Sequence, residues 1–291
     1  MQTWDVLALA ALAVLLIVQY LTRKIKNSFL TRTISGGVLV LVALLTISNG
    51  SWILYFTTLL LSLIALREMD KAVGVVEKET KTGPLEIGAM IGLVLYYISL
   101  RILYGSLQLL SLILALVILM FIYVFTYPRY HFTQVSGAFF GILYCGVMLS
   151  FVYQTRMLDN GTYLVWLIFL ASWGCDTCAY LAGRAFGKHK MTPVLSPKKT
   201  VEGGIGGIVG AIVLGLLYAL LTGGPFLEYA AICLFGALVS MVGDLSASAI
   251  KRNAGIKDYG RLIPGHGGVM DRFDSVIFTA PVIYLLAVTL L

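Results

Sequence analysis

The sequence has few charged residues for its length. Only 12% of its 291 residues are Asp, Glu, Lys or Arg, whereas 59% are hydrophobic and the mean hydropathy is +0.92. A soluble core cannot bury so large a share of apolar side chains. The composition therefore excludes an ordinary soluble domain and predicts an integral membrane protein.

Cysteine is also scarce, and its placement excludes a disulfide framework. Cys145, Cys175, Cys178 and Cys233 all lie inside apolar segments, where small hydrophobic packing is the usual role. Cys175 and Cys178 form a CxxC pair, but the sequence offers no second pair and no histidine near it. A structural zinc site is therefore disfavoured.

Two further features are missing. The first apolar segment has no basic stretch before it, and its positive charges follow it, so we expect a retained helix rather than a secretory signal. No internal repeat is evident, which removes support for the inverted-repeat architecture of many transporters.

Long apolar segments are what the sequence does contain. Crossing a hydrocarbon core of about 30 Å takes about 20 apolar residues in a helix. Segments of this kind occur at 5–22, 34–48, 52–66, 85–100, 107–126, 137–154, 163–182, 204–221, 228–250 and 273–291. The second and third are short and separated only by residues 49–51. We therefore expect an all-α polytopic membrane protein with nine or ten transmembrane helices.

Basic residues alternate between the two sides of this predicted bundle. The formal charge is +7, and 19 of the 21 basic residues fall in loops after odd-numbered segments, leaving Arg101 and Arg156 on the other side. Because Lys and Arg concentrate in cytoplasmic loops, we expect these loops in the cytoplasm, both termini outside, and the protein in the cell membrane. This distribution argues against a nucleic-acid partner.

The chain divides into two regions of different character. Residues 1–160 are rich in Leu, Val and Ile and predict N-terminal scaffold helices. Residues 161–291 gather Gly, Asp, Lys and His at segment ends and predict a catalytic region with two cytoplasmic loops. Attraction to anionic lipid headgroups explains the basic residues of the first three cytoplasmic loops. It does not explain the last two, which also carry acids and glycines.

Acidic residues in or beside the apolar segments indicate a functional site, because an ionisable group in hydrocarbon is costly. Asp176 and Asp244 lie in the cytoplasmic halves of their segments. Asp271 and Asp274 open the last segment at a spacing that places both on one helix face. Glu202 lies at the cytoplasmic entry to the eighth segment, at the same depth. Such carboxylates suit one or two hard divalent cations, although a helix cap or an ion pair is the alternative role for each.

The residues around these acids favour phosphate binding. Hydroxyl and ammonium groups precede the eighth segment at Ser196, Lys198, Lys199 and Thr200, where a helix N-terminus also attracts anions. The next cytoplasmic loop combines cations, flexible glycines and a histidine before the paired acids. Its candidate residues are Lys251, Arg252, Lys257, Arg261 and His266.

The stretch SAIKRNAGIKDYGRLIPGHGGVMDRFDS, residues 248–275, resembles the signature of phosphatidate cytidylyltransferases, also called CDP-diacylglycerol synthases. WGCDTCAYLAGRAFGKHK and SPKKTVEG resemble two other blocks of that family, so the resemblance covers about residues 170–290. It implies a multi-pass enzyme in the membrane lipids, commonly homodimeric. Such an enzyme uses CTP and a divalent cation, typically Mg²⁺, to convert phosphatidic acid into CDP-diacylglycerol and pyrophosphate.

The resemblance also implies roles for the candidate residues. Asp244 and Asp271 are the expected principal metal ligands, with Asp274 and Asp176 ligating or orienting beside them. Candidates for the CTP phosphates and the pyrophosphate are Lys198, Lys199, Lys251, Arg252 and Lys257, with Ser196, Thr200 and Glu202 nearby. Candidates for either the nucleotide or the lipid headgroup are Arg184, Lys188, Arg261 and His266.

Three other functions are the alternatives. A CTP-dependent polyprenol or dolichol kinase would release CDP rather than pyrophosphate, and the long signature argues against it. A CDP-alcohol phosphotransferase is disfavoured because its characteristic run of Asp-Gly, Ala-Arg and spaced Asp residues is missing. An ion-coupled transporter would place its acids near the membrane midplane, whereas these acids are expected in one leaflet.

Overall fold

The computed structural model describes residues 41–48, 51–76, 82–102, 106–263 and 267–291. Within these ranges, eight helical segments are long and apolar enough to cross a membrane. They coincide with the third to tenth predicted segments, which confirms the all-α polytopic fold. The first predicted segment and residues 34–40 of the second lie outside the described residues, so the total of nine or ten stays a prediction.

The N-terminal half of the described chain contains four of these spans. The first three are α3 (Ser51–Ala72), α4 (Pro84–Ile102) and α5 (Ser106–Phe125). The fourth is continuous but mixed, because α6 (Phe132–Gly141) passes through the π-helical turn η1 (Ile142–Val147) into α7 (Met148–Arg156). Large apolar side chains such as Leu109 and Phe121 are exposed on α5, as a lipid-facing helix requires.

The C-terminal half holds the other four spans and a small hairpin. The fifth span joins α8 (Gly161–Phe169), the π-helical turn η2 (Leu170–Gly174) and α9 (Cys175–Phe186). Strands β1 (Lys190–Thr192) and β2 (Ser196–Thr200) then pair antiparallel. The last three helices are α10 (Val201–Thr222), α11 (Phe226–Asn253) and α12 (Met270–Leu290). The hairpin is the one strand pair in the described residues, and the sequence analysis did not predict it.

Helices α9 to α12 pack as sequential neighbours, and α12 also packs on α7 and α8 of the rest of the bundle. Small residues allow α9 and α10 to approach closely. A Cβ built on Gly206 would collide with Ala182, and one on Gly207 would lie 2.9 Å from Cys175 O. All four cysteines are free, and Cys145, Cys175 and Cys233 are buried.

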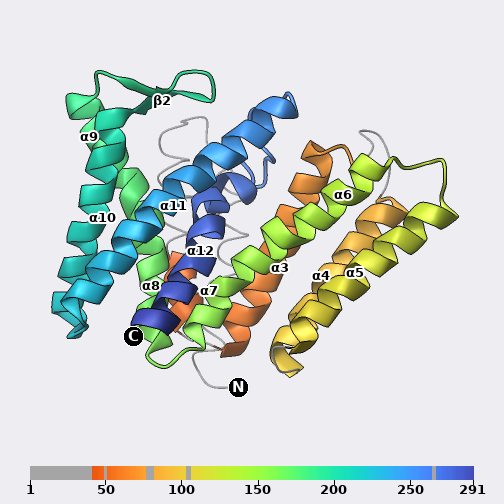
Figure 1. Ribbon diagram of the computed structural model, residues 1–291, viewed down its shortest axis with the longest axis horizontal. Coiled ribbons are helices and arrows are strands. Elements are labelled where there is room, and N and C mark those ends of the chain that lie inside the picture. The colour runs from red at the N-terminus through yellow and green to blue at the C-terminus, as the bar shows by residue number, and fades with distance from the viewer. Residues whose placement is uncertain (1–40, 49–50, 77–81, 103–105, 264–266) are drawn as a thin grey trace.

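The polar segments gather at one end of the bundle (Figure 1). The hairpin, the C-terminal ends of α3 and α11 and the start of α12 lie at this end, and the C-terminus of the chain lies at the other. Arg101 and Arg156 end α4 and α7 at the opposite side of the bundle. This separation agrees with the predicted segregation of basic residues, while the cytoplasmic orientation stays a prediction.

Candidate active site

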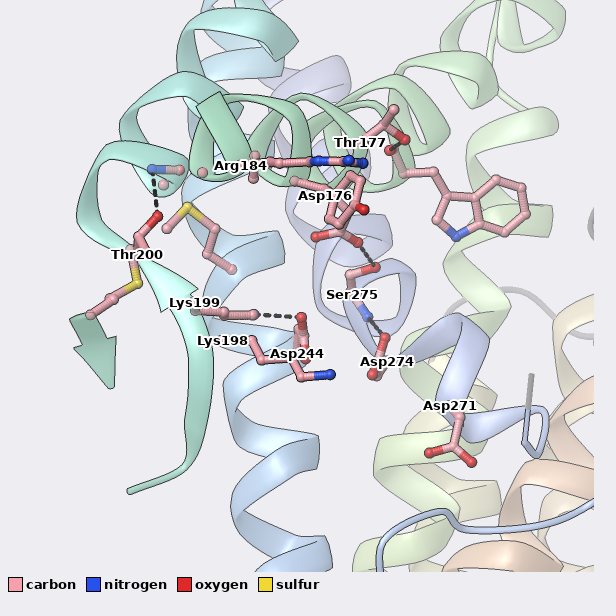
Figure 2. Close-up of a pocket in the computed structure, with 18 of the residues that line it drawn as sticks. Asp176, Thr177, Arg184, Lys198, Lys199, Thr200, Asp244, Asp271, Asp274 and Ser275 are labelled. Atoms are coloured by element: carbon pink, nitrogen blue, oxygen red, sulfur yellow. Dashed lines mark hydrogen bonds and ion pairs between the residues drawn. The ribbon is translucent and has the colours of Figure 1, made fainter. Parts of the chain in front are cut away.

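A cavity of about 720 Å³ opens where α9, the hairpin, the start of α10, α11 and the start of α12 meet. Figure 2 shows its polar side chains. Nine of the predicted site residues line it, namely Asp176, Arg184, Lys198, Lys199, Thr200, Asp244, Lys251, Asp271 and Asp274. Residues far apart in the sequence are therefore brought together at the polar end of the bundle.

Helical spacing explains which side chains of α9 reach the cavity. Asp176, Thr177, Tyr180 and Arg184 of α9 line it, as does Trp173 in η2 just before them, and residues three or four apart share one helix face. The π-helical turn η2 ends at Gly174, two residues before Asp176. A π-helical turn adds a residue to the helix and turns the face that follows, so η2 sets the direction in which α9 presents Asp176.

Helices α11 and α12 present their polar groups by the same periodicity. On α11, Asp244 and Lys251 are two turns apart and both line the cavity. On α12, Asp271, Asp274 and Ser275 share the first turns. The predicted one-face arrangement of Asp271 and Asp274 is therefore present.

The hairpin carries the basic side of the cavity. Lys199 Nζ forms an ion pair with Asp244 Oδ2, which joins β2 to α11. Thr200 is the N-cap of α10, and its Oγ1 accepts a hydrogen bond from Gly203 N at 3.1 Å. Lys198 is exposed beside them.

Three carboxylates face the cavity with one oxygen engaged each. Asp176 Oδ2 accepts a hydrogen bond from Ser275 Oγ at 3.3 Å, and Asp274 Oδ1 accepts one from Ser275 N at 2.8 Å. Asp244 uses Oδ2 in the ion pair with Lys199. The second oxygen of each carboxylate is left for a ligand.

Asp271 lies to one side of these three (Figure 2) and has more partners. Its Oδ1 accepts a hydrogen bond from Lys251 Nζ at 2.9 Å. Its Oδ2 accepts the backbone N–H groups of Tyr259 and Gly268, each at 2.9 Å. Asp271 therefore joins α11, the loop that follows it and the start of α12.

Residues 30–290 match the model of the cytidylyltransferase family. The chain belongs to this family. A protein of Staphylococcus saprophyticus is 32% identical over 275 residues, which cover 88% of this chain and 98% of the relative. A protein of Staphylococcus aureus (strain COL) is 33% identical over 270 residues, with the same coverage. Both relatives are named phosphatidate cytidylyltransferase, and the resemblance inferred from the motifs is confirmed.

Because it belongs to the cytidylyltransferase family, the chain is a nucleotidyltransferase. Its cavity also suits a hard divalent cation. Asp176, Asp244 and Asp274 offer oxygen donors only, which is the ligand type that Mg²⁺ prefers. In the described part of the chain, no three His, Cys, Asp or Glu side chains already converge as a metal site. Mg²⁺ commonly uses one or two carboxylates together with substrate phosphates, so a fully assembled protein cage is not required.

Several predicted residues lie outside the cavity lining, and their roles stay predictions. Glu202 accepts the backbone N–H groups of Lys188 at 3.1 Å and His189 at 3.2 Å, and thereby holds the base of the hairpin. The other described residues in this group are Ser196, Lys188, Arg252, Lys257 and Arg261. His266 lies outside the described residues.

Sequence reasoning missed other residues that line this cavity. Trp173, Arg272 and Ser275 line the cavity, and Trp173 Nε1 donates a hydrogen bond to Arg272 O at 3.2 Å. All three stand inside the quoted motif blocks, so the signal was present.

Tyr259 is buried, and this burial raises the pKa of its phenol. The neutral hydroxyl donates to Ala247 O at 3.0 Å.

Proposed function

We propose that the chain catalyses the reaction of CTP with phosphatidate to give CDP-diacylglycerol and pyrophosphate in phospholipid biosynthesis. A phosphate oxygen of phosphatidate attacks the α-phosphorus of CTP, and the bond from that phosphorus to the β-phosphate oxygen breaks. The observation that carries the proposal is a cavity lined by both carboxylates and basic side chains at the polar end of a membrane bundle. The matched relatives bear the name of this activity.

The chemistry requires positioning and charge neutralisation rather than a general base. The phosphatidate oxygen is already an anion near neutral pH, so no proton has to be removed from it. Catalysis then depends on aligning two anionic substrates and stabilising the charge that moves to the leaving group. Asp244, Asp274 and Asp176 would hold a Mg²⁺ ion, which when bound neutralises phosphate charge.

The basic side chains are the proposed contacts of the triphosphate. Arg184, Lys198, Lys199, Lys251 and Arg272 line the cavity from four different elements. Lys199 is paired with Asp244, and Lys251 is paired with Asp271. Each pair keeps its ammonium group oriented toward the cavity, where a nucleotide phosphate offers a further acceptor. Asp271 holds Lys251 in this way, and its predicted part as a metal ligand stays a prediction.

The remaining proposals concern the surroundings of the site. The substrate phosphatidate and the surrounding lipids would reach the cavity from the membrane, with the cavity at the cytoplasmic face of the cell membrane. The excess of basic residues at this end supports that orientation. A homodimer is the proposed assembly, as the motif resemblance implies.

The activity is tested by following both products. Purified protein with labelled CTP, phosphatidate and Mg²⁺ is expected to release pyrophosphate and to form labelled lipid in equal amounts. A CTP-dependent lipid kinase would instead release CDP and leave the label out of the lipid. Formation of CDP and a phosphorylated alcohol, with no pyrophosphate, would overturn the proposal.

Orientation is tested by cysteine labelling in intact cells. In a chain whose four native cysteines are replaced, Cys introduced for Asn160 should react with an impermeant reagent added outside. Cys introduced for Lys198 should not react, because Lys198 belongs to the basic end. The opposite pattern would place the cavity outside and remove access to cytoplasmic CTP.

Lys199→Ala is expected to raise the KM for CTP and for dCTP by the same factor, about 10- to 100-fold. A hydrogen bond to a charged group contributes about 1.5–3 kcal/mol, and Lys199 lies with the phosphate candidates rather than at an assigned base contact. Initial rates with both nucleotides measure the two factors. A changed preference between CTP and dCTP at unchanged overall rate would contradict the phosphate assignment.

A further inference from the structure

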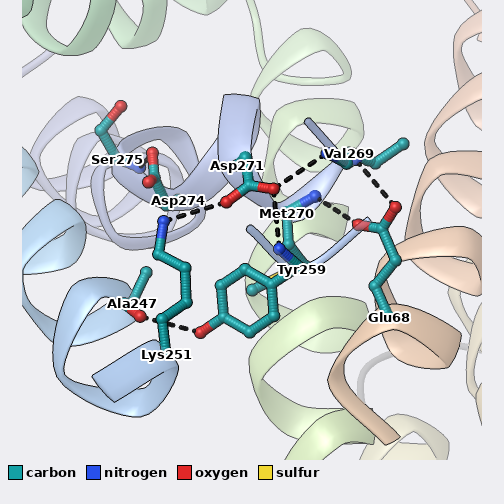
Figure 3. A network of polar contacts seen from close by, with 10 residues as sticks. Glu68, Ala247, Lys251, Tyr259, Val269, Met270, Asp271, Asp274 and Ser275 are labelled. Carbon is teal, nitrogen blue, oxygen red and sulfur yellow. Dashed lines mark hydrogen bonds and ion pairs between the residues drawn. The ribbon is translucent and has the colours of Figure 1, made fainter. Parts of the chain in front are cut away.

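Glu68 connects the N-terminal half of the chain to the active site. It lies near the C-terminal end of α3, and only 7% of it is exposed. Its Oε1 accepts the backbone N–H of Val269 at 3.1 Å, and its Oε2 accepts that of Met270 at 2.9 Å. Figure 3 shows this carboxylate next to the start of α12. The contact joins two parts of the sequence that are 201 residues apart.

The contact supplies what the start of α12 lacks locally. The first backbone N–H groups of a helix have no partner within the helix, and the helix dipole favours a negative group there. Val269 is the N-cap of α12 and provides no side-chain cap. A carboxylate from another helix therefore caps α12, using both of its oxygens.

Two glycines leave the space that this carboxylate occupies. A Cβ built on Gly268 would collide with both oxygens of Glu68, and one on Gly260 would collide with Oε1. Any larger residue at either position would displace the carboxylate or the loop. The described residues Gly260 and Gly268 of the loop between α11 and α12 thus leave room for Glu68.

The capped segment is the one that presents the catalytic acids. Gly268 N donates to Asp271 Oδ2, while the next two amides donate to Glu68. The first turn of α12 is therefore held between two carboxylates, and Asp274 follows one turn later. Glu68 does not line the cavity, so it does not touch the substrates.

We propose that Glu68 is a positioning residue, which fixes the first turn of α12 and thereby the placement of Asp271 and Asp274. The inference rests on the proposed function, because it concerns the acids assigned to that reaction. It gives the N-terminal half a part in catalysis through one defined contact.

Glu68→Gln tests this with little change in volume. The amide keeps one carbonyl oxygen, but its NH₂ group faces a backbone N–H, so one of the two hydrogen bonds is lost. We expect kcat to fall by roughly 10- to 100-fold, because small misplacements of reacting groups cost this much, with little change in the KM for CTP. Hydrogen exchange of residues 267–275 should become faster, because one amide there loses its acceptor and the first turn of α12 is held less firmly.

Glu86→Gln is the matched control. Glu86 is also buried in the same half, at 1% exposed, but its carboxylate faces Arg67 Nε at 3.2 Å instead of α12. This variant is expected to lower the melting temperature without changing exchange in residues 267–275 or the kcat of the folded protein. If Glu68→Gln behaved like Glu86→Gln, its role would be purely structural and the inference would be wrong.

A second route keeps the inference testable if one variant folds poorly. Gly260→Ala and Gly268→Ala push on the same carboxylate from the loop, so each should lower kcat and speed the same exchange. Combined with Glu68→Gln, each effect should be less than additive, since both changes remove one contact. Full additivity would overturn the inference. If the unchanged protein formed no CDP-diacylglycerol, the proposed function would fail, whereas the exchange comparison would still decide the contact.

Discussion

Asp244→Asn is expected to lower pyrophosphate release by about 100-fold or more while leaving the melting temperature nearly unchanged. Asparagine keeps the volume but removes the charge that would hold a cation, and loss of one electrostatic group acting on a transition state commonly costs this much. Asp244 is 24% exposed, and its ion-pair partner Lys199 is 28% exposed. An ion pair this accessible stabilises the fold by about 1 kcal/mol or less.

The measurement is pyrophosphate release by purified variants across a magnesium titration. Melting in detergent is recorded alongside. Asp258→Asn is the control, because Asp258 is an exposed loop acid outside the cavity lining and should leave turnover near normal. More magnesium should recover part of the Asp244→Asn activity if cation affinity is what falls. Normal turnover in Asp244→Asn would remove Asp244 from the proposed cation site.

The sequence predicted the bundle well because apolar length is a local property. Each described span coincides with a predicted segment, although most of the helices extend a few residues further than the apolar runs. These extensions hold functional residues: α9 continues past residue 182 to Phe186 and so includes Arg184. Polar residues at helix ends were assigned to loops because hydropathy does not detect them.

The hairpin was missed for a related reason. Residues 190–200 are largely polar and basic and contain few β-branched residues, so no alternating pattern marks them as strands. Their pairing depends on tertiary contacts, including the hydrogen bonds that Glu202 accepts from two backbone N–H groups at the base of the hairpin. Contacts of this kind follow from the fold and not from composition.

The sequence predicted which residues line the candidate site better than it predicted the contacts that hold them. Asp176, Asp244 and Asp274 face one cavity, as their intramembrane positions suggested. Glu68 was overlooked because it lies in a half of the sequence with no recognised motif, and its partners are backbone amides. A backbone N–H carries no residue-specific signal, so the cap on α12 is visible only in three dimensions.

Asp271→Asn is expected to abolish most activity and also to destabilise the fold, in contrast to Asp244→Asn. The Asp271 side chain is 3% exposed, and its oxygens accept hydrogen bonds from Lys251 and two backbone amides. Removing one partner of a buried ion pair leaves a charge without compensation and commonly costs about 3–5 kcal/mol. Lys251, at 13% exposed, would keep its charge with little water to solvate it.

A paired substitution separates the two consequences of losing Asp271. In Asp271→Asn with Lys251→Met, the uncompensated charge is removed as well, so the melting temperature should recover part of its loss. Activity should not recover, because Lys251 itself lines the cavity and is a proposed phosphate contact. Melting curves and pyrophosphate release from both single variants and the double variant complete the cycle. If activity returned together with the melting temperature, Asp271 and Lys251 would form a structural pair only, and neither would belong to the catalytic site.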